Sequence, residues 1–169
     1  MLLFTALLLH AFSGFASTSD SGEPSMCSML EYMGPHNESK YFLSKFYYVN
    51  AQQALNICSI CGMYLVEVND ESEFKFVQDI ARNSKTEYLL LSGSDAITEN
   101  NWVFPNNEPV KYKAWSSENP DNHLGVEDYL SIAKVYGYRM NDMPDPPNNN
   151  YKFLCERAIN SDDPLDQVK

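Results

Sequence analysis

The fold of this chain is set around the stretch Ala54-Leu-Asn-Ile-Cys-Ser-Ile-Cys-Gly-Met-Tyr-Leu-Val-Glu-Val68. Asn50, just upstream, is a residue type that caps helices, and the helix it starts runs through Cys58. Gly62 ends this helix, because glycine readily takes the left-handed conformation that follows a helix. Residues 63–68 then form a strand rich in apolar and β-branched side chains. A helix that runs directly into a strand is therefore the starting unit.

Patterns on either side of this unit predict a second helix and further strands. Asn69 or Asp70 caps the second helix, whose apolar residues Phe74, Val77 and Ile80 fall on one face. The predicted strands cover residues 40–48, 88–91, 129–135, 138–140 and 152–156. Residues 92–127 are loop-like, and so long a loop inside a compact domain is uncommon unless it is functional or held by something. We therefore look for the functional site in this loop.

The ends of the chain are expected to lie outside the domain. Residues 1–16 resemble a signal peptide, since an apolar, uncharged run is followed by small residues. The run is shorter than the roughly 20 residues that span a bilayer, so we expect a secreted protein without membrane insertion. Residues 17–38 and 158–169 are predicted to be mobile, which leaves residues 39–157 as one domain of ordinary size.

The chain is acidic, with a formal net charge of −11. Such a balance argues against nucleic acid or an anionic membrane as a partner. Acidic side chains gathered at one place could hold a hard cation.

Four cysteines stand at positions 27, 58, 61 and 155, and an even number in a secreted chain favours two disulfide bonds. The spacing from Cys58 to Cys61 would also suit a redox pair or half a zinc site. No second Cys or His pair stands at metal spacing, however. A disulfide framework is the simpler interpretation.

Several short motifs, taken in order and with their spacing, resemble the C-type lectin-like domain over residues 40–156. They are the opening stretch above, Ser94-Asp-Ala-Ile-Thr-Glu-Asn-Asn-Trp102, Trp115, Asn119-Pro-Asp-Asn122, Glu127-Asp128, Asn141-Asp142 and Phe153-Leu-Cys-Glu156. The resemblance implies an α+β fold, in which two helices flank small antiparallel sheets and a long loop region binds calcium. It also implies buried positions for Trp102 and Trp115.

The resemblance bears on the cysteines as well. It pairs Cys58 with Cys155, a bridge that closes a loop of nearly the whole domain. Family members usually carry a second bridge in the long loop, but here Tyr129 stands at one of its positions. Cys27 and Cys61 lie outside the family pattern. They either form a replacement bridge within the chain, or a disulfide joins two copies in a homodimer.

The resemblance further implies a calcium ion that binds sugar directly. Two neighbouring sugar hydroxyls reach the ion in the family, and the same side chains ligate the ion and hydrogen-bond to those hydroxyls. In this sequence, the positions that match the family's calcium and sugar ligands are Asn119, Asp121, Glu127, Asn141 and Asp142. Pro120 is expected to follow a cis peptide bond.

The sequence departs from the family pattern at this site. Mannose-preferring members commonly show Glu-Pro-Asn and galactose-preferring members Gln-Pro-Asp, so Asn119-Pro-Asp121 leans toward galactose. Met140 replaces the tryptophan that usually precedes the Asn-Asp pair. Tyr136 and Tyr138 are candidate neighbours of the sugar.

A second calcium site is suggested by four further residues of the loop region. They are Asp95, Glu99, Asn122 and Asp128. Asn122 stands where a carboxylate is commoner, so this site should be the weaker one. Ion binding there would help to order the long loop. Separately, Asn37-Glu-Ser39 is an acceptor sequence for N-glycosylation.

These observations predict a secreted lectin that binds glycans, microbial or self, in a calcium-dependent way. The alternative is a domain of the same family that binds a protein or a mineral surface without sugar. An enzyme is not expected, because no Gly-x-Ser-x-Gly elbow, His-Glu-x-x-His helix or glycine-rich phosphate loop is present in the sequence.

Overall fold

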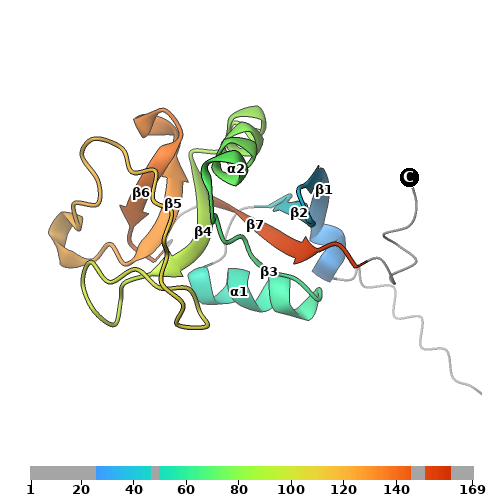
Figure 1. Ribbon diagram of the computed structural model, residues 1–169, viewed down its shortest axis with the longest axis horizontal. Helices are drawn as coiled ribbons and strands as arrows, with labels where there is room; N and C mark the ends of the chain where they lie inside the picture. Colours follow the sequence, from blue (N-terminus) through green and yellow to red (C-terminus); the bar gives the residue numbers. More distant parts are fainter. Residues whose placement is uncertain (1–25, 47–49, 146–150, 161–169) are drawn as a thin grey trace, which may run out of the picture.

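A computed structural model describes residues 26–46, 50–145 and 151–160, and Figure 1 shows the arrangement of the elements. The helices are α1 (Ala51–Ile60) and α2 (Glu71–Ser84), with short 3₁₀ segments η1 (Met26–Met29), η2 (His123–Gly125) and η3 (Lys134–Tyr136). The strands are β1 (Leu30–His36), β2 (Ser39–Ser44), β3 (Tyr64–Leu65), β4 (Tyr88–Ser94), β5 (Tyr129–Ala133), β6 (Arg139–Met143) and β7 (Tyr151–Ala158). The predicted signal peptide lies outside the described residues.

Both helices begin where the sequence predicts, because each has a side chain that caps it. The Asn50 side chain accepts a hydrogen bond from the Gln53 backbone N–H, and the Gln53 side-chain oxygen accepts one from the Asn50 backbone N–H, which makes a capping box. At the start of α2 the Asp70 side chain accepts a hydrogen bond from the Glu73 backbone N–H. Gly62 follows the C-cap of α1 with a φ of 69°, as expected for a helix stop.

The strands form one continuous path in the order β1-β2-β7-β4-β5-β6, and β3 also pairs with β7. All pairings are antiparallel except that of β4 with β7, which is parallel. In Figure 1, α2 and α1 lie on either side of these strands. The α+β prediction with two flanking helices is confirmed.

The two helices cover two separate cores. Phe74, Val77 and Ile80 of α2 pack with Leu89 and other buried residues in one cluster. The second cluster gathers around α1 and includes Leu90. Because neighbouring strand residues point to opposite faces, adjacent residues of β4 serve different cores.

Two disulfide bonds tie α1 to the rest of the domain. Cys58 pairs with Cys155 of β7 across 97 residues of sequence, as the family resemblance implied. Cys27 pairs with Cys61 and so attaches η1 to the end of α1. This internal bridge decides between the two alternatives for Cys27, and a homodimer linked through this cysteine is wrong for this structure.

The prediction that residues 17–38 are mobile is wrong for Leu30–His36. These residues form β1, an edge strand that pairs along its length with β2. The segment contains Gly34 and Pro35 and buries only Leu30, so its sequence lacks the alternation of a half-buried strand. Pairing with β2 and the Cys27–Cys61 bridge hold it in place.

Smaller differences concern the length of strands. Only Tyr64 and Leu65 of the predicted strand 63–68 pair as β3. The predicted strand 129–135 ends at Ala133, where η3 begins. Over the residues that the structure describes, no helix is both long and apolar enough to cross a membrane.

Candidate functional site

The long loop is held against β6 by backbone and side-chain contacts to Met140. The Ser116 N–H donates to the Met140 carbonyl at 2.9 Å, and the Met140 N–H donates to the Ala114 carbonyl at 3.0 Å. The Ala114 N–H also points to the Met140 sulfur, 3.0 Å away. Met140 is completely buried, so it fills the position where the family usually has tryptophan. These contacts fix the part of the loop around Ala114 and Ser116 beside the strand that carries Asn141 and Asp142.

An acidic cluster forms where this loop meets β6. One carboxylate oxygen from each of Asp121, Glu127 and Asp142 lies within 4.8 Å of the others. Two oxygens bound to one Ca²⁺ at 2.3–2.6 Å can be no more than about 5 Å apart, so the spacing suits a single calcium ion. Among the described residues, this is the one group of at least three Asp, Glu, His or Cys side chains that meets the spacing.

Two side-chain oxygens of the predicted ligand set lack a hydrogen-bond partner among the described residues. The Oδ1 atoms of Asn119 and Asp142 are both buried and unpartnered. The Asn119 side-chain NH2 donates to Ser116 Oγ at 2.7 Å, so the Asn119 Oδ1 points away from Ser116. The peptide bond between Asn119 and Pro120 is cis, as the resemblance implied. Buried polar atoms are normally paired, so these two oxygens have the character of metal ligands.

Backbone hydrogen bonds orient the carboxylates. The Asn122 N–H donates to Asp142 Oδ2 at 2.7 Å, which ties the loop to β6 and leaves the other oxygen of Asp142 free. The His123 N–H donates to Glu127 Oε2 at 3.0 Å. Burial raises the pKa of Glu127 above its ordinary value, and the nearby charges of Asp142 and Asp121 raise it further. A cation at the cluster would offset this repulsion.

A cavity of about 270 Å³ adjoins the cluster and has mixed walls. Asp121, Glu127 and Asn141 line one part of it. Tyr88, Tyr136 and Tyr151 are also in its lining, and the rings of Tyr88 and Tyr151 stack with their centroids 4.9 Å apart. Carboxylate and amide oxygens beside aromatic faces can bind a molecule that has both hydroxyl groups and an apolar face.

The four residues of the suggested second calcium site also come together. The Asp95 N–H donates to the Asp128 carbonyl at 3.2 Å, and the Asn122 amide donates to Glu99. Asp95 is buried, with Oδ1 unpartnered, and this burial raises its pKa, as does the charge of Glu99. Asn122 uses its own oxygen to accept the Glu127 N–H, which leaves it a poorer metal ligand.

The sequence model of the lectin C-type domain matches residues 48–157, well over half of the chain. That stretch contains both helices, the long loop and all the carboxylates of the acidic cluster. The chain belongs to the C-type lectin domain family. This family is generally non-enzymatic and its domains typically bind Ca²⁺.

Named relatives agree with this assignment. Lectin BRA-3 of Megabalanus rosa is 28% identical over 102 residues, which cover 58% of this chain and 57% of the relative. C-type lectin 37Da of Drosophila melanogaster is 27% identical over 128 residues, which cover 71% of this chain and 68% of the relative. The match to Lectin BRA-3 thus spans little more than half of that protein.

Solved structures confirm the C-type lectin fold. A human scavenger receptor C-type lectin carbohydrate-recognition domain has a TM-score of 0.64 at 22% identity, covering 77% of this chain and 96% of the other. A calcium-independent type II antifreeze protein has a TM-score of 0.61 at 18% identity, and the match covers 76% of this chain and 96% of the antifreeze protein. At these identities the likeness shows the fold alone, and this domain's own residues must indicate its ligand.

The structure brings four of the five residues expected around the primary ion close together. Asp121, Glu127 and Asp142 form the acidic cluster, and Asn141 lines the adjoining cavity with Asp121 and Glu127. Asn119 stands two residues before Asp121 in the same loop, and its Oδ1 is buried and unpartnered. Of the two tyrosines expected near the sugar, Tyr136 lines the cavity, whereas Tyr138 is partly buried against the core and is absent from the lining. Tyr88 and Tyr151 were missed, because each begins a strand and nothing in the sequence shows that β4 and β7 run parallel there.

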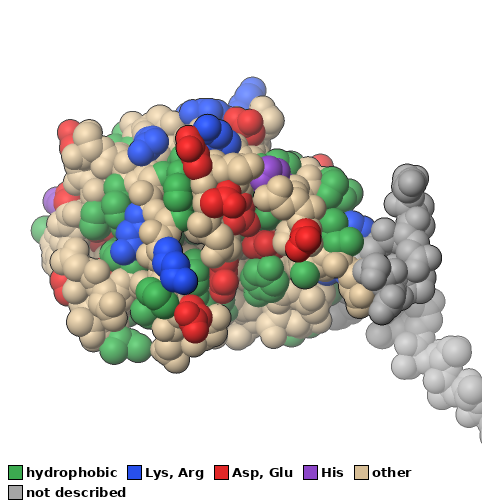
Figure 2. All heavy atoms as spheres, viewed as in Figure 1, with side chains coloured by type: hydrophobic (Ala, Val, Ile, Leu, Met, Phe, Trp, Pro, Cys, Tyr) green, Lys and Arg blue, Asp and Glu red, His purple; other side chains and the backbone are tan. Residues whose placement is uncertain are grey.

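The net negative charge is not what marks the site. On the face shown in Figure 2, Asp and Glu side chains are interspersed with Lys and Arg rather than gathered into one patch. An acidic chain therefore presents mixed charge over this face, as soluble proteins commonly do.

Proposed function

We propose that this domain binds sugars through a calcium ion held by Asn119, Asp121, Glu127, Asn141 and Asp142. The observation that carries the proposal is the convergence of three carboxylates within 4.8 Å beside a cavity with aromatic walls. The buried, unpartnered oxygens of Asn119 and Asp142 support it, because ion binding would satisfy both of them.

The proposed chemistry divides between the ion and the side chains. A bound Ca²⁺ supplies coordination positions for two neighbouring hydroxyl groups of a sugar. Asp121 and Glu127 accept hydrogen bonds from those hydroxyls, whereas Asn119 and Asn141 each offer both a donor and an acceptor. The Asn122 and His123 N–H groups keep the carboxylates of Asp142 and Glu127 turned toward the ion.

We expect galactose-type sugars to be preferred. Asp121 occupies the place that is Asp in the galactose-type motif of the family, and Asn119 differs from the usual Gln by one methylene group. The stacked Tyr88 and Tyr151 rings offer a flat apolar surface. Galactose presents an apolar face of C–H groups that packs well on such a ring.

The second set, Asp95, Glu99, Asn122 and Asp128, is proposed as a weaker calcium site that orders the long loop. Its test is limited proteolysis with calcium and with chelator. Chelation should speed cleavage between residues 95 and 128 while β4 and β5 stay intact. Equal cleavage under both conditions would refute this role.

The setting that fits this function is extracellular. Disulfide bonds such as Cys58–Cys155 persist in oxidising compartments. Asn37 of the glycosylation sequence is exposed at the turn between β1 and β2, where a glycan would meet no steric obstacle. We therefore propose a secreted lectin whose partners are microbial or self glycans.

A glycan array tests the function directly. The wild-type protein is applied with calcium and with chelator, beside Asp142→Asn and the control Asp79→Asn. Asp79 lies exposed on α2 and pairs only loosely with Arg82, 3.6 Å away, so its substitution removes the same charge without touching the site. We expect calcium-dependent binding by wild type and control, and loss of binding by Asp142→Asn.

The similarity to a calcium-independent antifreeze protein keeps one other function in view. If no glycan is bound with calcium present while the protein remains folded, the proposal fails. A binding domain for a protein or mineral surface then becomes the better description.

A further inference from the structure

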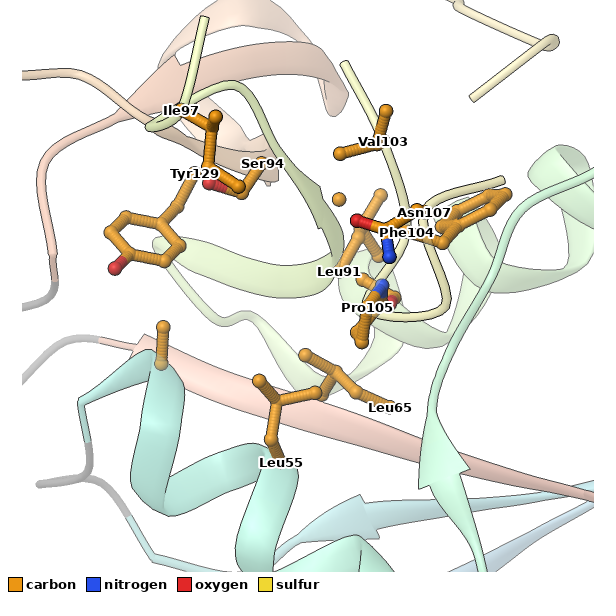
Figure 3. A pocket seen from close by; sticks show the side chains of 13 residues that line it. Leu55, Leu65, Leu91, Ser94, Ile97, Val103, Phe104, Pro105, Asn107 and Tyr129 are labelled. Atoms are coloured by element: carbon orange, nitrogen blue, oxygen red, sulfur yellow. The ribbon is translucent and has the colours of Figure 1, made fainter. Parts of the chain in front are cut away.

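A second cavity, which the sugar-binding proposal does not use, lies between α1 and the first part of the long loop (Figure 3). Its volume is about 190 Å³. Leu55 from α1, Leu65 from β3 and Leu91 from β4 form its apolar walls, and Phe104 and Pro105 close it from the loop. Within the described part of the chain, no charged side chain lines it.

Ser92 gives this cavity a polar point. Its side chain is 2% exposed, and its Oγ has no hydrogen-bond partner among the described residues. The Ser92 backbone N–H is already satisfied by the Val66 carbonyl at 2.8 Å, so only the hydroxyl is left over. Buried hydroxyl groups are normally hydrogen-bonded, and an unpaired one calls for an explanation. A ligand with its own hydrogen-bonding group would supply the missing partner.

An adjoining cavity enlarges the available space. It shares Leu55, Leu65, Ser92 and Pro105 with the first. Ser92 therefore belongs to the lining of both cavities, and its unpaired hydroxyl is itself buried.

The rim carries an apolar side chain that has nothing to cover it. Ile97 lines the mouth of the cavity and is 87% exposed. A single exposed isoleucine needs no special account. Here, however, it stands at the entrance of an apolar cavity, where an occupant would bury part of it.

Size and charge define the class of occupant. An apolar cavity of about 150 Å³ is enough to bind benzene, so this one accommodates a six-membered ring with a small substituent. The lining disfavours a charged ligand, because a charge moved out of water needs a partner there. We propose that this cavity binds a neutral, compact apolar molecule with one hydroxyl group, which hydrogen-bonds to Ser92. It shares no residue with the acidic cluster, and the proposal is independent of sugar binding.

Three probes of similar shape test the assignment by NMR titration of backbone amides. Benzyl alcohol has the ring and a hydroxyl, toluene has the ring alone, and benzoate has the ring and a charge. We expect benzyl alcohol to shift the amides of Ser92, Ile97 and Tyr129 and to bind about fivefold more tightly than toluene, as one hydrogen bond would give. Benzoate should bind more weakly than either.

Two variants locate the site. Ser92→Ala should reduce the affinity for benzyl alcohol to that for toluene, since only the hydrogen bond is lost. Leu55→Trp should fill the cavity and abolish binding of both. The matched control is Ile60→Trp, which places the same side chain on the 66% exposed Ile60 of the same helix, outside the cavity.

Amide dispersion in the spectrum of each variant shows whether it is folded. The proposal is overturned if no probe shifts these amides, as it would be if the cavity held only water. It is equally overturned if benzyl alcohol binds Leu55→Trp as well as it binds the wild-type protein, or if Ser92→Ala leaves the preference for benzyl alcohol unchanged.

Discussion

The variant Asp142→Asn should be more stable than the wild-type protein in chelator and less stable than it when calcium is added. Without calcium, the carboxylates of Asp121, Glu127 and Asp142 repel one another, with oxygens within 4.8 Å. Two unit charges at that distance repel by about 1 kcal/mol in a water-like dielectric, and the exposure of Asp121 keeps the value near this lower limit. An asparagine oxygen can still accept the Asn122 N–H. In chelator, the variant should therefore be more stable, by about 1 kcal/mol.

With calcium, the wild-type protein should become the more stable of the two. An ion present at 100 times its dissociation constant raises the free energy of unfolding by about 2.7 kcal/mol. For a domain of this size that corresponds to a rise in Tm of about 10 °C. The variant loses one carboxylate ligand and should gain less than half of this rise.

Differential scanning calorimetry in chelator and over a calcium titration measures both effects. Asp79→Asn serves as the control for the loss of one charge and should follow the wild-type protein. If Asp142→Asn gains as much from calcium as the wild-type protein does, then Asp142 is not a ligand and the cluster does not hold the ion.

Three further predictions follow from other parts of the domain. The double substitution Asn119→Glu with Asp121→Asn creates the mannose-type motif and should move glycan-array binding from galactose-type toward mannose-type sugars; an unchanged preference would show that selection lies elsewhere. Replacing both Cys27 and Cys61 by serine opens a loop of 34 residues, which should cost up to about 3.8 kcal/mol of unfolding free energy in denaturant titration. Calcium-dependent binding should stay intact, and lost binding in the folded variant would contradict this. Burial raises the pKa of the Glu156 carboxyl above its ordinary value of 4.5, so the native state holds this proton more tightly than the unfolded chain does, and the stability of the wild-type protein falls as the pH rises above 4.5. The stability of Glu156→Gln relative to wild type should therefore be higher at pH 7 than at pH 4. An equal difference in stability at both pH values would refute the raised pKa of Glu156.

The helices were predictable because their signals are local. A cap and its partner lie within three residues of each other, as Asn50 and Gln53 do. The apolar spacing of α2 likewise depends on its own residues alone. Tertiary packing needed only to bury faces that the sequence had already made apolar.

Strand β1 shows the opposite case. Leu30–His36 has little burial pattern of its own and contains residues typical of turns. Its backbone hydrogen bonds go to β2, so the partner and not the segment stabilises it. Propensity within the segment could not reveal this pairing.

The sequence by itself determined the family and the two helices, and it supplied the candidate set of oxygen-bearing side chains around residues 119–142. These features reside in residue identity and short spacing, which a one-dimensional pattern can carry. Only the tertiary structure decided that Cys27 pairs with Cys61, that Tyr88 and Tyr151 line a cavity beside the acidic cluster, and that Ser92 belongs to the lining of an apolar cavity. Each of these depends on segments distant in the chain, because strand pairing and helix packing set which of them meet.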